Sequence, residues 1–388
     1  MNILRHTIWI LLFTLATGCA TTDLAPVGPG EFQKEKDEKG LWRQSEEIAT
    51  RIRSSDMVYH DEVLSSYINS VARGLFPEDM YDQIAFKVTI VKDPRLNAFA
   101  LPNGDLFLHT GIVAHMENEA QLAILLGHEM THSTHRHSVR SLRNLKNQSA
   151  FFSVAMLGGV DYGGLLGSLG FMASVSGYSQ DLERQADEVG FQLMLEAGYD
   201  PAQAPRLFEH LKEDILREGG KEPFFFGSHP RLQERIDNYN SFIRALEPGF
   251  GEKKNTDTFS SRITGLIYDN VGLDLKAGRF EVALDGANRY VQLNPDNPAG
   301  YCITGDIWQQ KDPLKGGQLA LDAYGKALEF DPDWARAHRG LGVIAFKAGD
   351  DRKAVHHLQR YIELDPDTAD RAYIEQYIDQ IKMRGGGS

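Results

Sequence analysis

A repeat in the last third of the chain is the feature that most restricts its fold. Prolines recur in three copies of a short acidic motif, "NPDNP", "DPDWA" and "DPDTA", at Pro295, Pro332 and Pro366. An alanine lies twelve residues before each of these prolines. A period of about 34 residues is that of a helix–turn–helix unit. Such units bury their apolar faces only by stacking on one another, so this part of the chain is predicted to be an all-α solenoid.

The copies resemble tetratricopeptide repeats, which are pairs of antiparallel helices. Gly305 and Gly342 occupy the small-residue position of that motif, whereas the first copy has Val271 there. Residues 371–384 follow the third copy and are predicted to form a capping helix. We therefore expect residues 261–388 to be a tetratricopeptide repeat domain that binds segments of other proteins on its concave face.

A second feature is a cluster of histidines in "LLGHEMTHSTHRHS", residues 125–138. At 3.6 residues per turn, His128 and His132 project from one face of a helix, so both imidazoles can bind one metal ion. Glu129 lies about 100° further around the helix, where it can hold a water on the same ion. The chain contains 13 histidines, so a chance match of this HExxH pattern is the alternative.

A catalytic zinc needs a third protein ligand and one open position. The glycine and histidine that a metzincin would carry downstream are replaced by His135 and Ser138, which excludes that class. The segment "SQDLERQADEVGFQLMLEAG" (179–198) offers Glu183 as the third ligand. One turn later, Asp187 offers a carboxylate that could fix the orientation of a ligating histidine. Alone, such an ExxxD pair is typical of a solvated helix face.

Four motifs follow one another along the chain. They are "NAFALPNGDLFLHTG" (97–111), "HEMTH" with the trailing "RH" (128–137), "ERQAD" (183–187) and "SHPRLQERI" (228–236). Together they resemble the HtpX and CAAX prenyl protease type of zinc metallopeptidases. Within that family they are most similar to the periplasmic branch of β-barrel assembly-enhancing proteases. The resemblance covers residues 41–247 and implies an α+β zincin-like domain, mostly helical with a small sheet.

The resemblance also implies a set of site residues. It assigns one Zn2+ per chain to His128, His132 and Glu183, with Glu129 as the general base and Asp187 as a carboxylate that supports a ligand. Membrane-embedded members of the family carry an arginine just before the third ligand, and this chain has "YSQDL" there. The group that stabilises the oxyanion is therefore left open.

His229 stands in the last of these motifs. Pro230 disfavours a helical conformation at His229, which places the histidine on a loop just before a helix that begins near Arg231. In the assembly-enhancing branch the matching histidine lies over the zinc, so the resemblance implies a removable fourth ligand that keeps the enzyme latent. A surface or capping histidine is one alternative, and an oxyanion donor is another.

The stretch "FKVTIVKDPRLNAFALPNGDLFLHTG" (86–111) alternates like paired strands. Turns are predicted at Asp93–Pro94 and Asn103–Gly104. The candidate for an edge strand consists of Asn97, Ala98, Phe99 and Ala100. A peptide substrate could add to such an edge through backbone hydrogen bonds. An ordinary core hairpin is the alternative.

The chain begins like an exported lipoprotein. Residues 1–19 combine a basic start, an apolar run and "LATGC", which is similar to a lipobox with alanine in place of the usual leucine. Lipid would be attached to Cys19, and Ala20 after it resembles the sorting pattern for the outer membrane. We therefore expect a lipid anchor in the inner leaflet of the outer membrane, facing the periplasm. A soluble periplasmic protein with a plain secretory signal is the alternative. Residues 20–40 are predicted to be a flexible tether.

Charge and composition narrow the choice of partners. The net charge is −13 and no basic stripe is visible, which argues against nucleic acid. Residues 151–177 are apolar and hold seven glycines around Asp161. We expect a mobile hairpin beside the cleft, touching substrate or bilayer, rather than a membrane-spanning helix. Residues 248–260 are polar and are predicted to link the two domains.

Two functions from different classes fit these features. In the first, the chain is a zinc-dependent endopeptidase of the bacterial periplasm that degrades misfolded or stalled envelope and outer-membrane proteins. Its repeats would then recruit substrate or the outer-membrane assembly machinery. In the second, it is an outer-membrane-anchored scaffold or chaperone-like lipoprotein with latent peptidase activity. The metal triad and its general base favour the first, because a scaffold needs neither.

Overall fold

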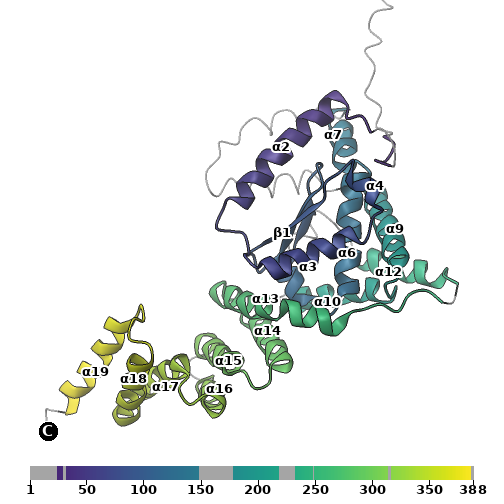
Figure 1. The fold of residues 1–388 in the computed structure, drawn as a ribbon. Coiled ribbons are helices and arrows are strands. Elements are labelled where there is room, and N and C mark those ends of the chain that lie inside the picture. The colour runs from purple at the N-terminus through teal and green to yellow at the C-terminus, as the bar shows by residue number, and fades with distance from the viewer. Residues whose placement is uncertain are drawn as a thin grey trace, which may run out of the picture.

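The computed structural model of the chain describes residues 24–28, 32–147, 178–217, 232–247, 249–312 and 316–385. A mostly helical domain with one small sheet is followed by a row of helix pairs that extends away from it (Figure 1). This confirms the predicted fold class, an α+β domain followed by an all-α solenoid. Among the residues described, no helix is both long enough and apolar enough to cross a lipid bilayer.

The described helices fall into two groups along the chain. The first group comprises α2 (Lys36–Arg53), α3 (Glu62–Arg73), α4 (Glu78–Tyr81), α5 (Thr110–His115), α6 (Glu119–Thr134), α7 (His137–Asn147), α9 (Gln180–Glu196), α10 (Gln203–Arg217) and α12 (Leu232–Arg244). The second group comprises α13 (Thr256–Lys276), α14 (Phe280–Leu293), α15 (Pro298–Lys311), α16 (Gly317–Phe330), α17 (Ala335–Ala348), α18 (Asp351–Leu364) and α19 (Arg371–Gly385). The repeats therefore begin inside the segment 248–260 that was predicted to be a linker.

The sheet consists of β1 (Lys87–Val91), β2 (Ala98–Ala100) and β3 (Asp105–His109), in the order β1–β3–β2. β3 pairs in parallel with β1 and antiparallel with β2. The predicted turn at Asn103–Gly104 is present, with a positive φ of 93° at the glycine. The predicted pairing across Asp93–Pro94 is wrong. All five residues of β3 are buried, so this strand takes the centre and separates β1 from β2.

The segment that follows the predicted signal peptide packs against the domain. Leu24 and Val27 are buried, and the Val27 N–H donates a 2.7 Å hydrogen bond to the Thr134 carbonyl at the end of α6. Helix α2 already begins at Lys36. The prediction of a flexible tether over residues 20–40 is therefore wrong for its described part. Burial of apolar side chains and the unsatisfied carbonyls of a helix end hold this part of the chain in place.

Three helix pairs, α13 with α14, α15 with α16 and α17 with α18, stack in sequence, and α19 closes the row (Figure 1). A Cβ at Gly305 would lie 2.6 Å from the Tyr324 ring, which explains why the repeat needs a small residue there. In the first pair the small residue is on the other helix, because a Cβ at Gly286 would lie 2.7 Å from Val271. The departure of the first copy at Val271 is thus compensated on its partner helix.

The two domains share one hydrophobic core. Phe259 and Ile263 of α13 are fully buried in the cluster that forms the core of the first domain. Asn255 donates a 2.6 Å hydrogen bond to Glu119, the first residue of α6, and Arg279 donates to the Pro94 carbonyl at 2.8 Å. The connection between the domains is therefore fixed. Helix α13 begins within the predicted linker because its apolar residues cover the first domain.

Candidate metal centre

Helix α6 carries the HExxH residues through the middle of the first domain. Asn118 caps its N-terminus by accepting a 3.1 Å hydrogen bond from the Gln121 N–H. All 16 residues of α6 are buried, so His128, Glu129 and His132 are removed from bulk water. Polar groups in such a position need hydrogen-bonding partners, because burying them without partners is costly.

Three possible ligand atoms meet between α6 and α9. His128 Nε2 lies 3.1 Å from His132 Nε2, and the Glu183 carboxylate lies 3.5 Å and 3.6 Å from these two nitrogens. Tetrahedral ligands at the usual zinc distance of about 2.1 Å are about 3.4 Å apart. The spacing of the three atoms therefore fits one tetrahedral ion. No other group of three such residues occurs in the part of the chain that the structure describes.

A buried carboxylate faces the outer ring nitrogen of His128. Asp187 Oδ1 lies 3.0 Å from His128 Nδ1, and Asp187 accepts hydrogen bonds from Arg235 at 2.6 Å and from Tyr239 at 2.7 Å. Burial by itself lowers the pKa of Arg235, but attraction to Asp187 outweighs this effect and the pKa is raised. Asp187 can accept the Nδ1 proton of His128, which directs the Nε2 lone pair towards the metal position.

The outer ring nitrogen of His132 faces another histidine. His132 Nδ1 and His137 Nδ1 are 2.9 Å apart, and His137 Nε2 lies 3.1 Å from the Gln185 side-chain oxygen. An amide oxygen only accepts, so His137 donates from Nε2 and accepts at Nδ1 from His132. Burial lowers the pKa of His137 to about 3, which favours this neutral form. The Tyr178 ring stacks on His132, with the two ring centroids 4.0 Å apart.

Two glycines set the distance between α6 and α9. A Cβ on Gly190 would lie 2.7 Å from the His128 backbone nitrogen, and a Cβ on Gly127 would lie 3.0 Å from the Gly190 carbonyl oxygen. A side chain at either position would press on the backbone of the other helix. Gly190 lies two turns after Glu183, so this close crossing holds the glutamate against the two histidines.

Replacing Gly190 with alanine should separate α9 from α6, because the nearest atom is backbone and cannot rotate aside. We expect a loss of about 1–3 kcal/mol in the free energy of unfolding, together with a lower metal affinity. Gly265→Ala is the matched control, since a Cβ at this helical glycine meets nothing within 4 Å. Denaturant titration and metal competition measure the two effects. Wild-type values for both in Gly190→Ala would contradict this role of the crossing.

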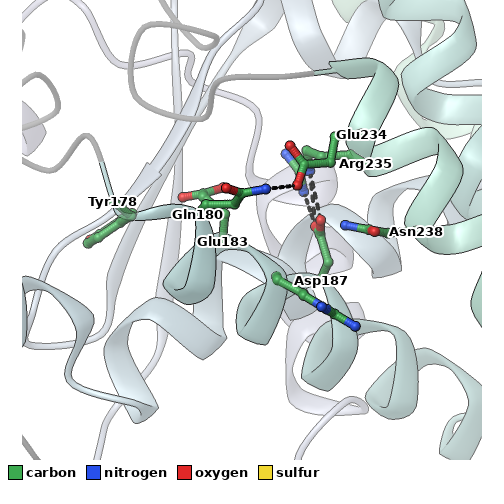
Figure 2. A pocket seen from close by; sticks show the side chains of 8 residues that line it. Tyr178, Gln180, Glu183, Asp187, Glu234, Arg235 and Asn238 are labelled. Carbon is green, nitrogen blue, oxygen red and sulfur yellow. Dashed lines mark hydrogen bonds and ion pairs between the residues drawn. The ribbon is translucent and has the colours of Figure 1, made fainter.

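A cavity of about 160 Å³ lies beside the carboxylates of the site, lined in part by Glu183, Asp187 and Arg235 (Figure 2). Gln180 at the start of α9 donates a hydrogen bond to Glu234 of α12 at the rim of this cavity (Figure 2). Together with the Arg235–Asp187 ion pair, this contact joins α12 to α9 beside the cavity. The cavity therefore provides a small space next to the metal position.

The predicted edge strand lies next to the HExxH helix. Ala98–Ala100 form β2, at one edge of the described sheet, and Asn97 precedes the strand. The Asn97 carbonyl accepts a 3.0 Å hydrogen bond from the His109 N–H. Ser133 of α6 donates to the Leu101 carbonyl at 2.9 Å, just after β2. The strand is thus one residue shorter than predicted and is tied to the helix that carries the site.

The structure brings together the residues that the sequence predicted for the metal site. His128, Glu129 and His132 lie on α6, and Glu183 and Asp187 lie on α9, where these two helices cross. Other predicted features lie outside the described residues, namely Cys19, the segment 151–177 and His229.

Three further side chains that hold this site were not among the predicted residues. Arg235 and Tyr239 bind Asp187 from α12, and His137 faces His132. Arg235 and His137 lie within the motifs "SHPRLQERI" and "HEMTHSTHRH", so the sequence did contain a signal that these two residues belong to the site. Tyr239 lies four residues after Arg235, on the same face of α12, and a lone tyrosine gave no signal by itself.

Comparisons with known proteins agree with this geometry. Residues 61–242 match the sequence profile of Peptidase family M48. This stretch of the chain is an M48 domain. The chain is 27% identical over 208 residues to a β-barrel assembly-enhancing protease of Yersinia pestis, a match that covers 51% of this chain and 43% of that protein. It is 29% identical over 215 residues to the mitochondrial metalloendopeptidase OMA1 of Schizosaccharomyces pombe, covering 55% and 61% of the two chains.

By its family match the M48 domain is a metallopeptidase domain. The alignments span 43% and 42% of the assembly-enhancing proteases of Yersinia pestis and Escherichia coli, less than half of either protein. Among solved structures, the tetratricopeptide repeat protein YrrB is 16% identical, with a TM-score of 0.28 over 53% of this chain and 89% of that chain. A TM-score this low carries no argument, so the repeat fold is assigned from the helix pairs alone.

Proposed function

We propose that the chain is a zinc-dependent endopeptidase of the bacterial periplasm that degrades misfolded or stalled envelope and outer-membrane proteins. The observation that carries the proposal is the spacing of 3.1–3.6 Å among the ligand atoms of His128, His132 and Glu183. Two imidazoles and one carboxylate are a donor set of catalytic zinc sites in peptidases. The similarity to metalloendopeptidases supports a peptide bond as the target.

In this proposal the side chains of α6 and α9 have separate roles. His128, His132 and Glu183 would hold zinc, which would supply Lewis acid chemistry at the attacking water and the scissile carbonyl. Glu129, next to the first ligand, takes the proton of the attacking water and later passes it to the leaving amine. Asp187 orients the ring of His128, as its 3.0 Å contact with Nδ1 allows.

We infer that an extended substrate binds along β2. The outer edge of Ala98–Ala100 leaves backbone groups to which a peptide can add as a further strand. The Ser133–Leu101 hydrogen bond holds the end of this strand against α6. A substrate bound in this way would run past His132, since Ser133 is the next residue on the helix.

The repeat domain would recruit protein partners to the peptidase. A cavity of about 630 Å³ follows α15, α17 and the turn after α18, and Trp334 is part of its lining. Asp306 pairs with Arg336 at 2.5 Å, and Arg339 pairs with Asp370 at 2.5 Å, also along this cavity. An aromatic ring beside charges of both signs suits a polypeptide segment. The names of the bacterial relatives support outer-membrane assembly machinery as the source of that partner.

We place the protein in the periplasm, with lipid on Cys19 holding it to the inner leaflet of the outer membrane. The "LATGC" sequence supports this location, and a soluble periplasmic form is the alternative. The relatives named for β-barrel assembly support the same compartment, because β-barrels are proteins of the outer membrane.

The direct test is incubation of the lipid-free protein with an unfolded outer-membrane protein, with and without a zinc chelator. We expect fragments that disappear with the chelator and return when zinc is added back in excess. If the substrate stays intact under every condition, also with assembly partners added, the peptidase proposal is wrong and the scaffold function remains. Fragments that persist with the chelator would indicate a contaminating or metal-independent protease.

His229→Ala tests whether the enzyme is kept latent. If His229 is the removable fourth ligand, the variant should cleave itself and other substrates faster than the wild type. If His229 instead stabilises the oxyanion, turnover should fall by on the order of a hundredfold with zinc retained. Metal content and initial rates of both proteins distinguish the two roles, and we expect the faster variant. A slower variant with full zinc would contradict the latch.

A further inference from the structure

Residues 24–28, which we call the strap, lie across the C-terminal end of the HExxH helix. The Val27 N–H donates to the Thr134 carbonyl at 2.7 Å, and the side chains of Leu24 and Val27 are buried. The last carbonyls of a helix have no partner within the helix, so the strap completes α6. This contact lies two residues after His132, or about 3 Å along the helix axis.

Two buried arginines fix the strap and α2 to the same end of the domain. Arg136, two residues after the end of α6, has a φ of 57°, an uncommon conformation for a residue other than glycine. It donates to the Ala25 carbonyl of the strap at 3.3 Å and to Glu38 of α2 at 2.6 Å. Arg143 of α7 pairs with Glu35, just before α2, at 2.6 Å. The N-terminal part of the chain is therefore bound to α6 and α7 at several points.

We propose that the strap holds the C-terminal end of α6 close to a lipid bilayer, so that the M48 domain acts on polypeptides at the membrane surface. The inference rests on the proposed lipid on Cys19. Five residue steps separate Cys19 from the docked Leu24, and a chain covers at most about 3.6 Å per step. The strap therefore begins within about 18 Å of the lipid-bearing residue. A free tether of twenty residues would let the domain turn in any direction, and the docked strap removes that freedom.

The position of the strap also orients the repeats. Helices α2 and α7, which bind the N-terminal segment, lie at one end of the molecule, and α15 to α19 lie at the other (Figure 1). Anchoring at the first end directs the repeats away from the bilayer and into the periplasm. The peptidase site would then receive chains at the membrane surface, while the repeats bind partners that approach from the periplasm.

Energy transfer on vesicles tests this orientation. A donor dye is placed on Lys39→Cys in α2 or on Tyr373→Cys in α19, both exposed positions, with an acceptor on the lipid headgroups. Cys302 is buried and burial raises the pKa of its thiol to about 12, so it should stay unlabelled. We expect several-fold more transfer from Lys39→Cys. Twenty glycine and serine residues inserted after Thr22 add a coil of about 25 Å, so this transfer should fall.

Two strap variants provide the matched comparison. Val27→Pro removes the N–H that binds Thr134 and should lower the transfer from Lys39→Cys, as the insertion does. Gly28→Ala should change nothing, because a Cβ there meets no atom within 4 Å. Circular dichroism of each variant checks that the helices remain folded.

The outcomes separate the anchor from the strap. Absence of labelled palmitate on the wild type, compared with Cys19→Ser, would overturn the anchor and with it the membrane orientation. Lipid incorporation with equal transfer from both dye positions would overturn the orientation alone. Neither result would affect cleavage of an unfolded protein in solution, which tests the proposed peptidase function separately.

Discussion

Glu129→Gln should bind zinc like the wild type and lose peptide hydrolysis by at least about a hundredfold. The amide has nearly the same shape as the carboxylate, so the buried helix α6 can keep its packing. It cannot take a proton from the attacking water. In the proposed site Glu129 is not a ligand, so its replacement should leave the metal affinity unchanged. Metal analysis and cleavage of an unfolded substrate measure the two properties on one preparation.

Glu188→Gln is the matched control for this experiment. It makes the same chemical change on α9, one residue after Asp187, at an exposed position. Its activity and metal content should equal those of the wild type. An active Glu129→Gln would overturn the proposed mechanism, whereas an inactive variant that has also lost its metal would make Glu129 a structural or ligating residue.

Local spacing was sufficient to predict the central part of the site. His128 and His132 are four residues apart, and helical geometry alone places them on one face. Glu183 and Asp187 repeat that spacing on a second helix, which the structure brings against the first. The repeat domain was visible for the same reason, because the period of its prolines and alanines is a local property of the chain.

Contacts between segments that are far apart in the sequence could not be predicted from it. The crossing of α6 and α9 depends on Gly127 and Gly190, and a glycine within a helix does not reveal which backbone approaches it. The strap was mistaken for a tether since its few apolar residues, such as Val27, become buried only against a helix end more than a hundred residues away. The shared core could not be predicted for the same reason. Phe259 lies on α13, a helix assigned to the second domain, but it packs into the core of the first.

Asp187→Ala should have the largest effect on stability among the variants considered for this site. Asp187 is 1% exposed and accepts hydrogen bonds from Arg235 and Tyr239, which are also buried. Removing the carboxylate leaves the Arg235 charge in the interior without its nearest counter-charge. We expect a loss of about 3–5 kcal/mol in the free energy of unfolding of the metal-free protein. Loss of the contact with His128 should also weaken zinc binding by about 10–100-fold.

A second substitution separates these two effects. The double variant Asp187→Leu with Arg235→Met removes both buried charges of this ion pair. Its two apolar side chains fill much of the space that the pair occupied. Its stability should recover most of the loss, because replacing a buried ion pair by apolar residues is often close to neutral. Its zinc affinity should stay low, since neither new side chain can accept the Nδ1 proton of His128. Denaturant unfolding and metal competition measure the pair of quantities for each variant. A double variant that regains zinc affinity along with stability would show that Asp187 acts on the metal site only through folding.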